Sequence, residues 1–136
     1  MPAKPKILLI EGHIPTAMLL VASLSQAWCE TEVATTGKRA QQLAQEFDFD
    51  LIALDPYLPD ARGFETFLHL RQITALSATP IIFVARHCDD ADWRRGLALG
   101  AADYIEKPFS GPSFLRRILS HIKHKSRPDL VAVEIP

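Results

Sequence analysis

Four short segments of this chain carry side chains that can do chemistry together. They are Glu11-Gly12-His13, Asp55, Ala85-Arg86 and Glu106-Lys107-Pro108-Phe109. Each follows an apolar run that is typical of a buried parallel strand. The carboxyl ends of such strands form the binding crevice of an open α/β sheet, so we expect the segments to meet there. Carboxylates bind hard cations and act as nucleophiles, and an ammonium group neutralises anions. The sequence therefore predicts a charged site at one edge of a sheet.

Five β–α repeats are expected to position these segments. The sequence predicts strands at Lys6–Ile10, Thr31–Ala34, Leu51–Leu54, Pro80–Val84 and Asp103–Ile105. It predicts helices over about Pro15–Ser25, after a Thr36 cap, over about Gly63–Ile73, over about Ala91–Leu99 and from near Ser110. The last helix has a clear apolar stripe, and Phe64, Phe67, Leu68 and Arg71 share helical spacing in the third. Strict β–α alternation predicts a parallel sheet with helices on both faces. Of the few topologies that right-handed crossovers allow, we choose the flavodoxin-like α/β order 2-1-3-4-5.

Length and composition limit the classes of protein. A chain of 136 residues has a one-domain length, and a net charge of -1 gives no bulk attraction to nucleic acid or to a membrane. No apolar run is long enough to span a bilayer, and the first residues do not form a signal peptide, so we expect a cytoplasmic protein. Cys29 and Cys88 fall at opposite ends of the predicted sheet, too far apart to be bridged, so two free thiols are expected.

The order of these motifs resembles the receiver domains of two-component response regulators, over about Lys4 to Lys123. Asp55 is followed by Pro four residues on and by Gly eight residues on, as in that family, and Lys107-Pro108-Phe109 matches its Lys-Pro-Phe motif. The resemblance implies a CheY-like fold with Asp55 as phosphoacceptor and Lys107 as a charge clamp on the phosphoryl group. It also implies an ion pair between the two at rest and a cis Lys107–Pro108 bond. A plain salt bridge at the mouth of the sheet is the alternative for this pair.

The metal site of the family is only partly matched. The resemblance implies Mg²⁺ ligands at Glu11, at Asp55 and at the backbone carbonyl of Tyr57. Gly12 stands where a directly coordinating Asp is usual, so weak Mg²⁺ binding is expected. We weighed a transition-metal site at His13 and His87 against surface histidines and favour the latter.

The switch residues of the family also differ. Ala85 replaces the Thr or Ser whose hydroxyl contacts the phosphoryl group, and Tyr104 matches the aromatic residue that rotates inward. A half-buried tyrosine at the sheet edge is an equally good interpretation of Tyr104. Arg86 is either a guanidinium on the phosphoryl group or, as we favour, a solvated side chain. An ordinary solvated face is slightly favoured over a partner-binding face for Trp93 and for four arginines, Arg94, Arg95, Arg116 and Arg117.

Three functions follow from these patterns. The leading one is a phosphorelay receiver that takes a phosphoryl group from a histidine kinase or phosphotransfer partner, with an output domain or a second copy as further partners. The second is a pseudo-receiver, a protein-binding module that works without phosphorylation. The third, a flavodoxin-like enzyme or nucleotide binder, is disfavoured because the loop after Ile10 lacks a phosphate-cradling pattern, so no enzyme is expected. Residues 1–125 are predicted to form the receiver. Residues 126–136 are predicted to form a tail, which is either a linker or an extra strand.

Overall fold

The computed structural model describes residues 4–61, 63–73, 76, 78–86, 90–107 and 110–122. Within them strands and helices alternate along the chain. The strands are β1 (Lys6–Ile10), β2 (Glu30–Ala34), β3 (Leu51–Leu54), β4 (Ile81–Ala85) and β5 (Asp103–Glu106). The helices are α1 (Ile14–Gln26), α2 (Gly37–Glu46), α3 (Gly63–Arg71), α4 (Asp90–Ala98) and α5 (Gly111–His121). All the predicted elements are therefore confirmed, with small differences at their ends.

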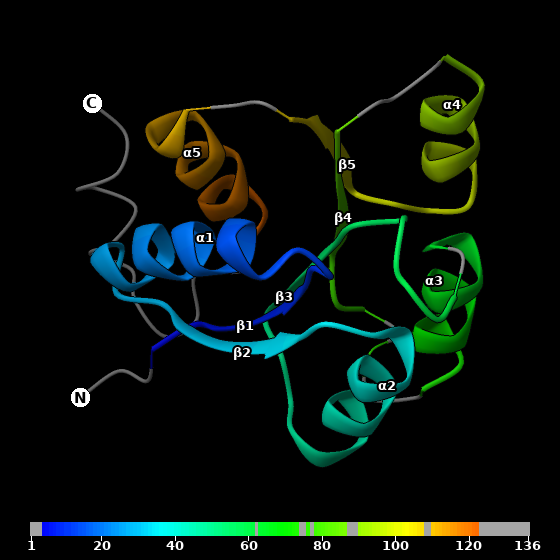
Figure 1. Cartoon of the computed structure of the whole chain (residues 1–136), viewed down its shortest axis with the longest axis horizontal. Coiled ribbons are helices and arrows are strands. Elements are labelled where there is room, and N and C mark those ends of the chain that lie inside the picture. Colours follow the sequence, from blue (N-terminus) through cyan, green and yellow to red (C-terminus); the bar gives the residue numbers. More distant parts are fainter. Residues whose placement is uncertain are drawn as a thin grey trace.

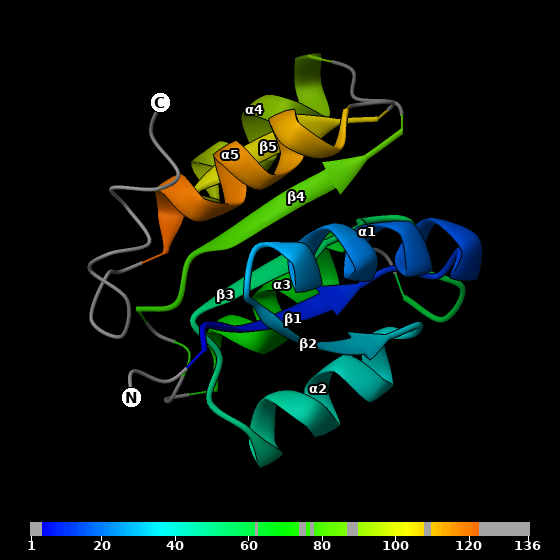
Figure 2. The same cartoon turned by 90° about the vertical axis from the view of Figure 1, so that its left-hand side faces the viewer.

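The strands form one parallel sheet in the order β2-β1-β3-β4-β5, which confirms the predicted topology. In Figure 2 the strand arrows run in one direction, so their carboxyl ends lie at the same edge. The order places β1 between β2 and β3, and it places β4 between β3 and β5. Successive side chains of a strand point to opposite faces of the sheet. Because helices cover both faces, side chains that point to either face are buried in the central strands, and these strands can be continuously apolar.

The two faces of the sheet carry separate apolar cores. Alternate strand residues such as Leu9, Ala53, Val84 and Ile105 pack under α1 and α5, and we call this the α1/α5 core. The residues between them, such as Ile10, Leu54, Phe83 and Ala85, belong to the core on the opposite face, which we call the α2/α3 core. Figure 1 shows α1 and α5 together on one side, with α2, α3 and α4 on the other. The face to which a side chain near a strand end points can therefore be assigned from the two-residue period of the strand.

Local sequence explains where several helices begin and end. Thr36 caps α2 by accepting a hydrogen bond from the Arg39 N–H at 3.1 Å, as predicted, and Ser110 caps α5 through the Ser113 N–H at 3.1 Å. His13 has the same role at α1, where its side chain accepts from the Thr16 N–H at 3.4 Å. Gly100 follows α4 with φ +104°, a left-handed conformation that suits glycine at this position.

The third helix buries a different set of residues from the one its spacing indicated. Phe67 is fully buried as expected, but Leu68 is 45% exposed and Leu70 is fully buried in its place. Arg71 lies half-buried because its guanidinium donates to the carbonyls of Leu76 and Thr79, at 2.9 and 2.6 Å. Burial lowers the pKa of Arg71. Its hydrogen bonds tie the end of α3 to the segment that leads into β4.

Some predictions fall outside the described residues. They concern His87, Cys88, the Lys107–Pro108 bond and the tail 126–136, and they stay predictions. The side chain of Trp93 also lies outside the described part. Cys29 is buried and forms no disulfide within the described part of the chain, as expected. In the described part of the chain, every helix is too short or too polar to cross a bilayer.

A charged cluster fastens α5 to β5. Arg117 of α5 makes an ion pair with Asp103, and its Nε lies 3.1 Å from Asp103 Oδ2. His121 Nε2 lies 3.1 Å from the same oxygen. Burial alone would raise the pKa of Asp103, but hydrogen bonds from Arg117, the Tyr104 N–H and His121 together lower it. Arg94, Arg95, Arg116 and Arg117 are all exposed, as expected, and Arg117 in addition forms this ion pair.

Replacing Asp103 with Asn should lower the free energy of unfolding at pH 7 by up to about 1 kcal/mol, as for a partly exposed ion pair. The pKa of Asp103 is lowered in the folded state. Asp103 therefore stabilises the fold at pH values above 3.8, its ordinary pKa, and this stabilisation is lost as the pH falls below that value. Urea denaturation from pH 7 to about pH 3 should show the difference from the wild type narrowing. The exposed Asp48 provides a matched control as Asp48→Asn. A difference that does not change with pH would contradict this account.

Candidate functional site

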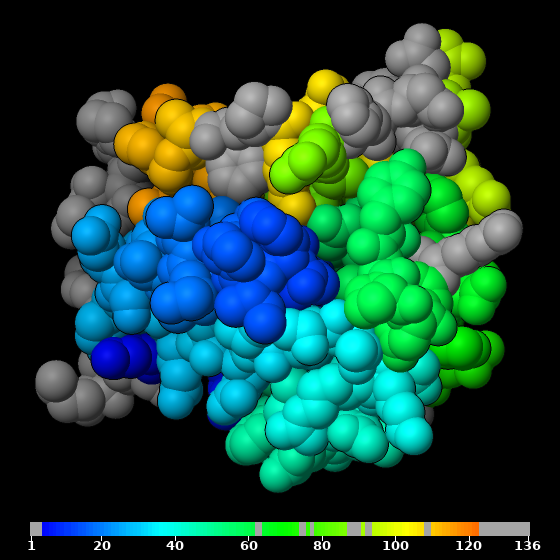
Figure 3. Space-filling view, viewed as in Figure 1, coloured from blue at the N-terminus to red at the C-terminus, as the bar shows by residue number. Residues whose placement is uncertain are grey.

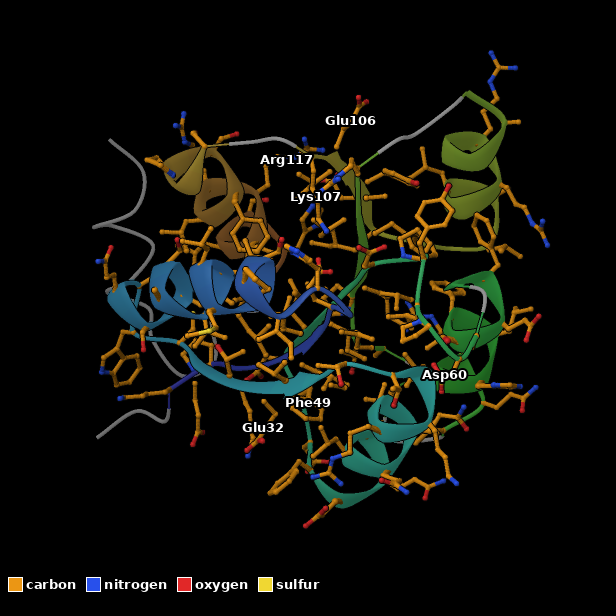
Figure 4. All side chains as sticks on the ribbon, in the orientation of Figure 1. Glu32, Phe49, Asp60, Glu106, Lys107 and Arg117 are labelled. Atoms are coloured by element: carbon orange, nitrogen blue, oxygen red, sulfur yellow. The ribbon has the colours of Figure 1, made fainter. Side chains whose placement is uncertain are left out.

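Three charged side chains from different strand ends meet at the carboxyl edge of the sheet. Lys107 Nζ lies 2.9 Å from Asp55 Oδ2, and Lys107 also forms an ion pair with Glu11. The side chains of Lys107, Glu11 and Asp55 are only 12%, 3% and 11% exposed. In Figure 4 Lys107 lies at this edge, whereas its neighbour Glu106 projects outward. The ion pair expected between Asp55 and Lys107 is present, and the ion pair with Glu11 adds to it.

The backbone ladder explains why these residues converge. Hydrogen bonds between neighbouring strands continue just past the strand ends, at 2.9 Å from the Asp55 N–H to Ile10 and at 2.7 Å from the Lys107 N–H to Ala85. Asp55 and Lys107 lie two residues beyond Ala53 and Ile105, which belong to the α1/α5 core. The period of two places their side chains on that same face. Glu11 has the same relation to Leu9.

Both carboxylates accept further hydrogen bonds. Asp55 Oδ1 accepts from the Tyr57 N–H at 2.8 Å, and Glu11 Oε2 accepts from the His13 N–H at 3.0 Å. Each carboxylate thus has one oxygen on the Lys107 ammonium and the other on a backbone N–H. These bonds fix the orientation of both carboxylates. The arrangement leaves Asp55 held at the mouth of a cleft and partly open to solvent.

The cleft extends from these charges toward α3 and α4. Its lining includes Glu11, Asp55, Tyr57, Phe64, Arg86, Arg95 and Lys107. The Arg95 guanidinium carbon lies 4.5 Å from the centre of the Phe64 ring on the wall formed by α3 and α4. Figure 3 shows the start of α1, in deep blue, beside the green loop after β3 on one face of the molecule. Arg86 is exposed and lines the cleft, a position that fits both a solvated side chain and a guanidinium that contacts a phosphoryl group.

Asp60 fixes the loop that follows β3, a role that the sequence did not indicate. Its carboxylate accepts from the backbone N–H groups of Gly37 and Lys38, at 2.7 and 3.1 Å, and so connects this loop to the start of α2 (Figure 4). These two backbone hydrogen bonds hold the pKa of Asp60 below its usual value. The partners are more than twenty residues away in the chain, so no local pattern around Asp60 identifies them.

The two switch positions lie inside the α2/α3 core. Ala85 is fully buried. Tyr104 lies on the edge strand β5, as one interpretation had it, but it is only 4% exposed and not half-buried. The Tyr104 ring packs against Phe83, with centroids 5.6 Å apart and planes at 34°. Phe83 also packs against Phe67 and Phe64, both at 5.4 Å. Because Ala85 has only a methyl group, no side-chain hydroxyl is present at that position to contact a ligand at the site.

The residues fit a Mg²⁺ ion only in part. Mg²⁺ prefers six oxygen ligands, and Glu11 and Asp55 both already contact the Lys107 ammonium. Among the described residues, no group of three or more His, Cys, Asp or Glu side chains could hold a metal ion. A Cβ at Gly12 would lie 3.1 Å from Pro59 Cδ, so the space for a third carboxylate is narrow. His13 Nδ1 lies 2.7 Å from Thr16 Oγ1, in its capping role.

The fold and the site together define a CheY-like α/β domain with an acidic pocket and a lysine at the carboxyl edge of its sheet. Residues 7–120 match the family model of the response regulator receiver domain, and the chain belongs to this family. Among solved structures, it is similar to the chemotaxis protein CheY4 of Vibrio cholerae, with a TM-score of 0.84 and 28% identity over 88% of this chain and 100% of that one.

Two further relatives bear on the site and on the extent of the chain. The receiver domain of the sensor histidine kinase PA1611 of Pseudomonas aeruginosa is described with a magnesium ion in its active-site cleft. It has a TM-score of 0.79 and 27% identity over 88% of this chain and 98% of that one. The phosphate regulon regulatory protein PhoB of Rhizobium meliloti is 32% identical over 94% of this chain and 56% of its own length. The chain spans about half the length of the curated relatives it matches.

Replacing Lys107 with Met should lower the free energy of unfolding at pH 7 by roughly 2–4 kcal/mol, because Glu11 and Asp55 would lose the cation between them. The double variant Glu11→Gln/Lys107→Met removes one of the two charges and should recover more than half of that loss. Urea denaturation followed by circular dichroism measures both, with Arg116→Met as an exposed control. Equal stability of Lys107→Met and the wild type would contradict the proposed importance of this ion pair.

Proposed function

We propose that this chain is a phosphorelay receiver that accepts a phosphoryl group on Asp55 from a histidine kinase or phosphotransfer partner. The observation that carries the proposal is the contact between Lys107 Nζ and Asp55 Oδ2 at 2.9 Å, in a pocket that opens to solvent. A carboxylate that is oriented by a cation and remains accessible is suited to attack a phosphorus atom.

The transfer needs few components. An Asp55 oxygen forms a bond to the phosphorus of the donor phosphohistidine while the P–N bond breaks, and its electron pair stays with the imidazole nitrogen. The product is an acyl phosphate on Asp55. The transferred phosphoryl oxygens carry negative charge into the pocket, and the Lys107 ammonium, already in contact with Asp55, neutralises part of it. This transfer is a single signalling event, not enzymatic turnover.

We infer that Mg²⁺ binds weakly at this pocket. Glu11, Asp55 and the Tyr57 carbonyl would hold the ion, and a bound Mg²⁺ would neutralise charge on the phosphoryl oxygens. The lack of a carboxylate at Gly12 and the engagement of both remaining carboxylates by Lys107 support weak binding.

A specific observation also supports the alternative function, a phosphorylation-independent pseudo-receiver that binds protein partners. Ala85 offers no hydroxyl to follow a phosphoryl group, and Tyr104 is already packed inward against Phe83. A domain built in this way would keep one state of the switch whether or not Asp55 carried a phosphoryl group. Partner binding would then set its output.

In either role we propose that residues 1–125 form the receiver unit and residues 126–136 a tail or linker. An output domain is a natural further partner, since the matches to this chain cover only 49 to 57% of the length of these relatives. A second copy of the chain is another binding partner that we propose. We place the protein in the cytoplasm, where a phosphorelay receiver meets its donor.

Incubation with acetyl phosphate and excess Mg²⁺ should add one phosphoryl group to the wild type and none to Asp55→Asn, because only the Asp55 carboxylate is placed as acceptor. Intact mass spectrometry measures the adduct. Asp50→Asn, an exposed aspartate at the far end of the sheet, should label like the wild type. The absence of any adduct, both with acetyl phosphate and with phosphorylated histidine phosphotransfer domains, would favour the pseudo-receiver.

Replacing Gly12 with Asp should strengthen Mg²⁺ binding roughly tenfold by adding a charged oxygen ligand. Pro59 limits the space, so the double variant Gly12→Asp/Pro59→Ala should bind at least as tightly as Gly12→Asp alone. Isothermal titration calorimetry measures the affinity, and Gly12→Asn controls for size without charge. A wild type that already binds Mg²⁺ as tightly as Gly12→Asp would show that the pocket is not depleted.

A further inference from the structure

We propose that Arg86 takes over the charge and hydrogen-bonding roles that are missing from this pocket, so that Asp55 accepts a phosphoryl group without a metal ion. The inference rests on the proposed receiver function and concerns how the same site is completed. Two groups are missing from the pocket of this chain. Gly12 provides no metal-binding carboxylate, and Ala85 provides no side-chain hydrogen-bond donor. One guanidinium group can supply both positive charge and N–H donors.

The position of Arg86 follows from the order of the strands. Arg86 is the first residue after β4, and β4 lies between β3, which leads to Asp55, and β5, which leads to Lys107. The Lys107 N–H donates to the carbonyl of Ala85, immediately before Arg86, at 2.7 Å. Arg86 is therefore attached at the strand end between the acceptor and its lysine.

The alternation of side chains indicates the same placement. Arg86 lies two residues beyond Val84, a member of the α1/α5 core. Asp55 and Lys107 have this same relation to Ala53 and Ile105. The period of two therefore directs Arg86 toward the face on which the charged site is built, and Arg86 lines the same cleft as Asp55 and Lys107.

The charges of the site give Arg86 a role. Glu11, Asp55 and Lys107 sum to -1, since two carboxylates share one ammonium group. A phosphoryl group adds negative charge, with up to about two charges on its oxygens. Arg86 forms no salt bridge with a described residue, and it is exposed, so its guanidinium is available for a new anion. Arginine binds phosphoryl oxygens through two parallel N–H donors, which a single hydroxyl cannot do.

Arg95 offers a matched comparison within the cleft. It also lacks a salt bridge to a described residue, but its guanidinium is stacked on the Phe64 ring and extends from α4, which covers the opposite face of the sheet. Its charge contributes to the cleft as a whole. Only Arg86 extends from the strand between the acceptor and the lysine, and the two arginines therefore separate local contact from general charge.

The experiment measures labelling of Asp55 by acetyl phosphate in EDTA and in excess Mg²⁺, using intact mass spectrometry. The Asp55 oxygen bonds to phosphorus, the donor P–O bond breaks and acetate leaves with the electron pair. We expect the wild type to label in EDTA, and Arg86→Ala to label about ten- to a hundredfold more slowly there, the range for losing a hydrogen bond to a charged group. Arg86→Lys should be intermediate, and Arg95→Ala should stay within about twofold of the wild type.

A second readout does not depend on the donor. Beryllofluoride, a non-transferable mimic of the phosphoryl group, should give a bound ¹⁹F NMR signal in EDTA with the wild type and a much weaker one with Arg86→Ala. Circular dichroism should show both folded to the same extent, since Arg86 is exposed. Labelling and beryllofluoride binding that need Mg²⁺ and ignore Arg86→Ala would overturn this inference while leaving the receiver function in place. No adduct and no bound signal under any condition would overturn both.

Discussion

The shared ion pair of Lys107 with Glu11 and Asp55 is the interaction on which the site depends. It joins the ends of β1, β3 and β5, which lie far apart in the sequence. Two largely buried carboxylates repel each other, and burial weakens the screening that water would provide. The ammonium group removes that repulsion and fixes both acids at once. The carboxyl edge of the sheet is therefore a preformed charged pocket, and any ligand must compete with or extend this pairing.

The positions around the ion pair offer few further polar side chains. Gly12 provides no carboxylate, and Pro59 already lies close to where one would extend. Ala85 provides no hydroxyl, and it belongs to the same core as Tyr104, which lies against Phe83. Arg86 is an exposed charged residue directly after β4.

Two further aspartates fasten elements of the fold to one another. Asp60 ties the loop after β3 to the start of α2, and Asp103 ties β5 to α5 through Arg117 and His121. Both aspartates have a lowered pKa because they accept several hydrogen bonds. Neither touches the central ion pair. Asp60 acts at the cleft that it lines, whereas Asp103 acts at the amino end of β5.

The sequence by itself determined the strands, the helices, the parallel order and the convergence of Asp55 and Lys107. These follow from apolar runs of strand length and from the rule that parallel strand ends share one edge, so local pattern is sufficient. Only the tertiary structure decided that Glu11 shares Lys107 with Asp55, how deeply Tyr104 is buried, and what Asp60 and Arg117 bind. Those outcomes depend on how loops and helices far apart in the chain pack together, and short-range periodicity contains no information about such contacts.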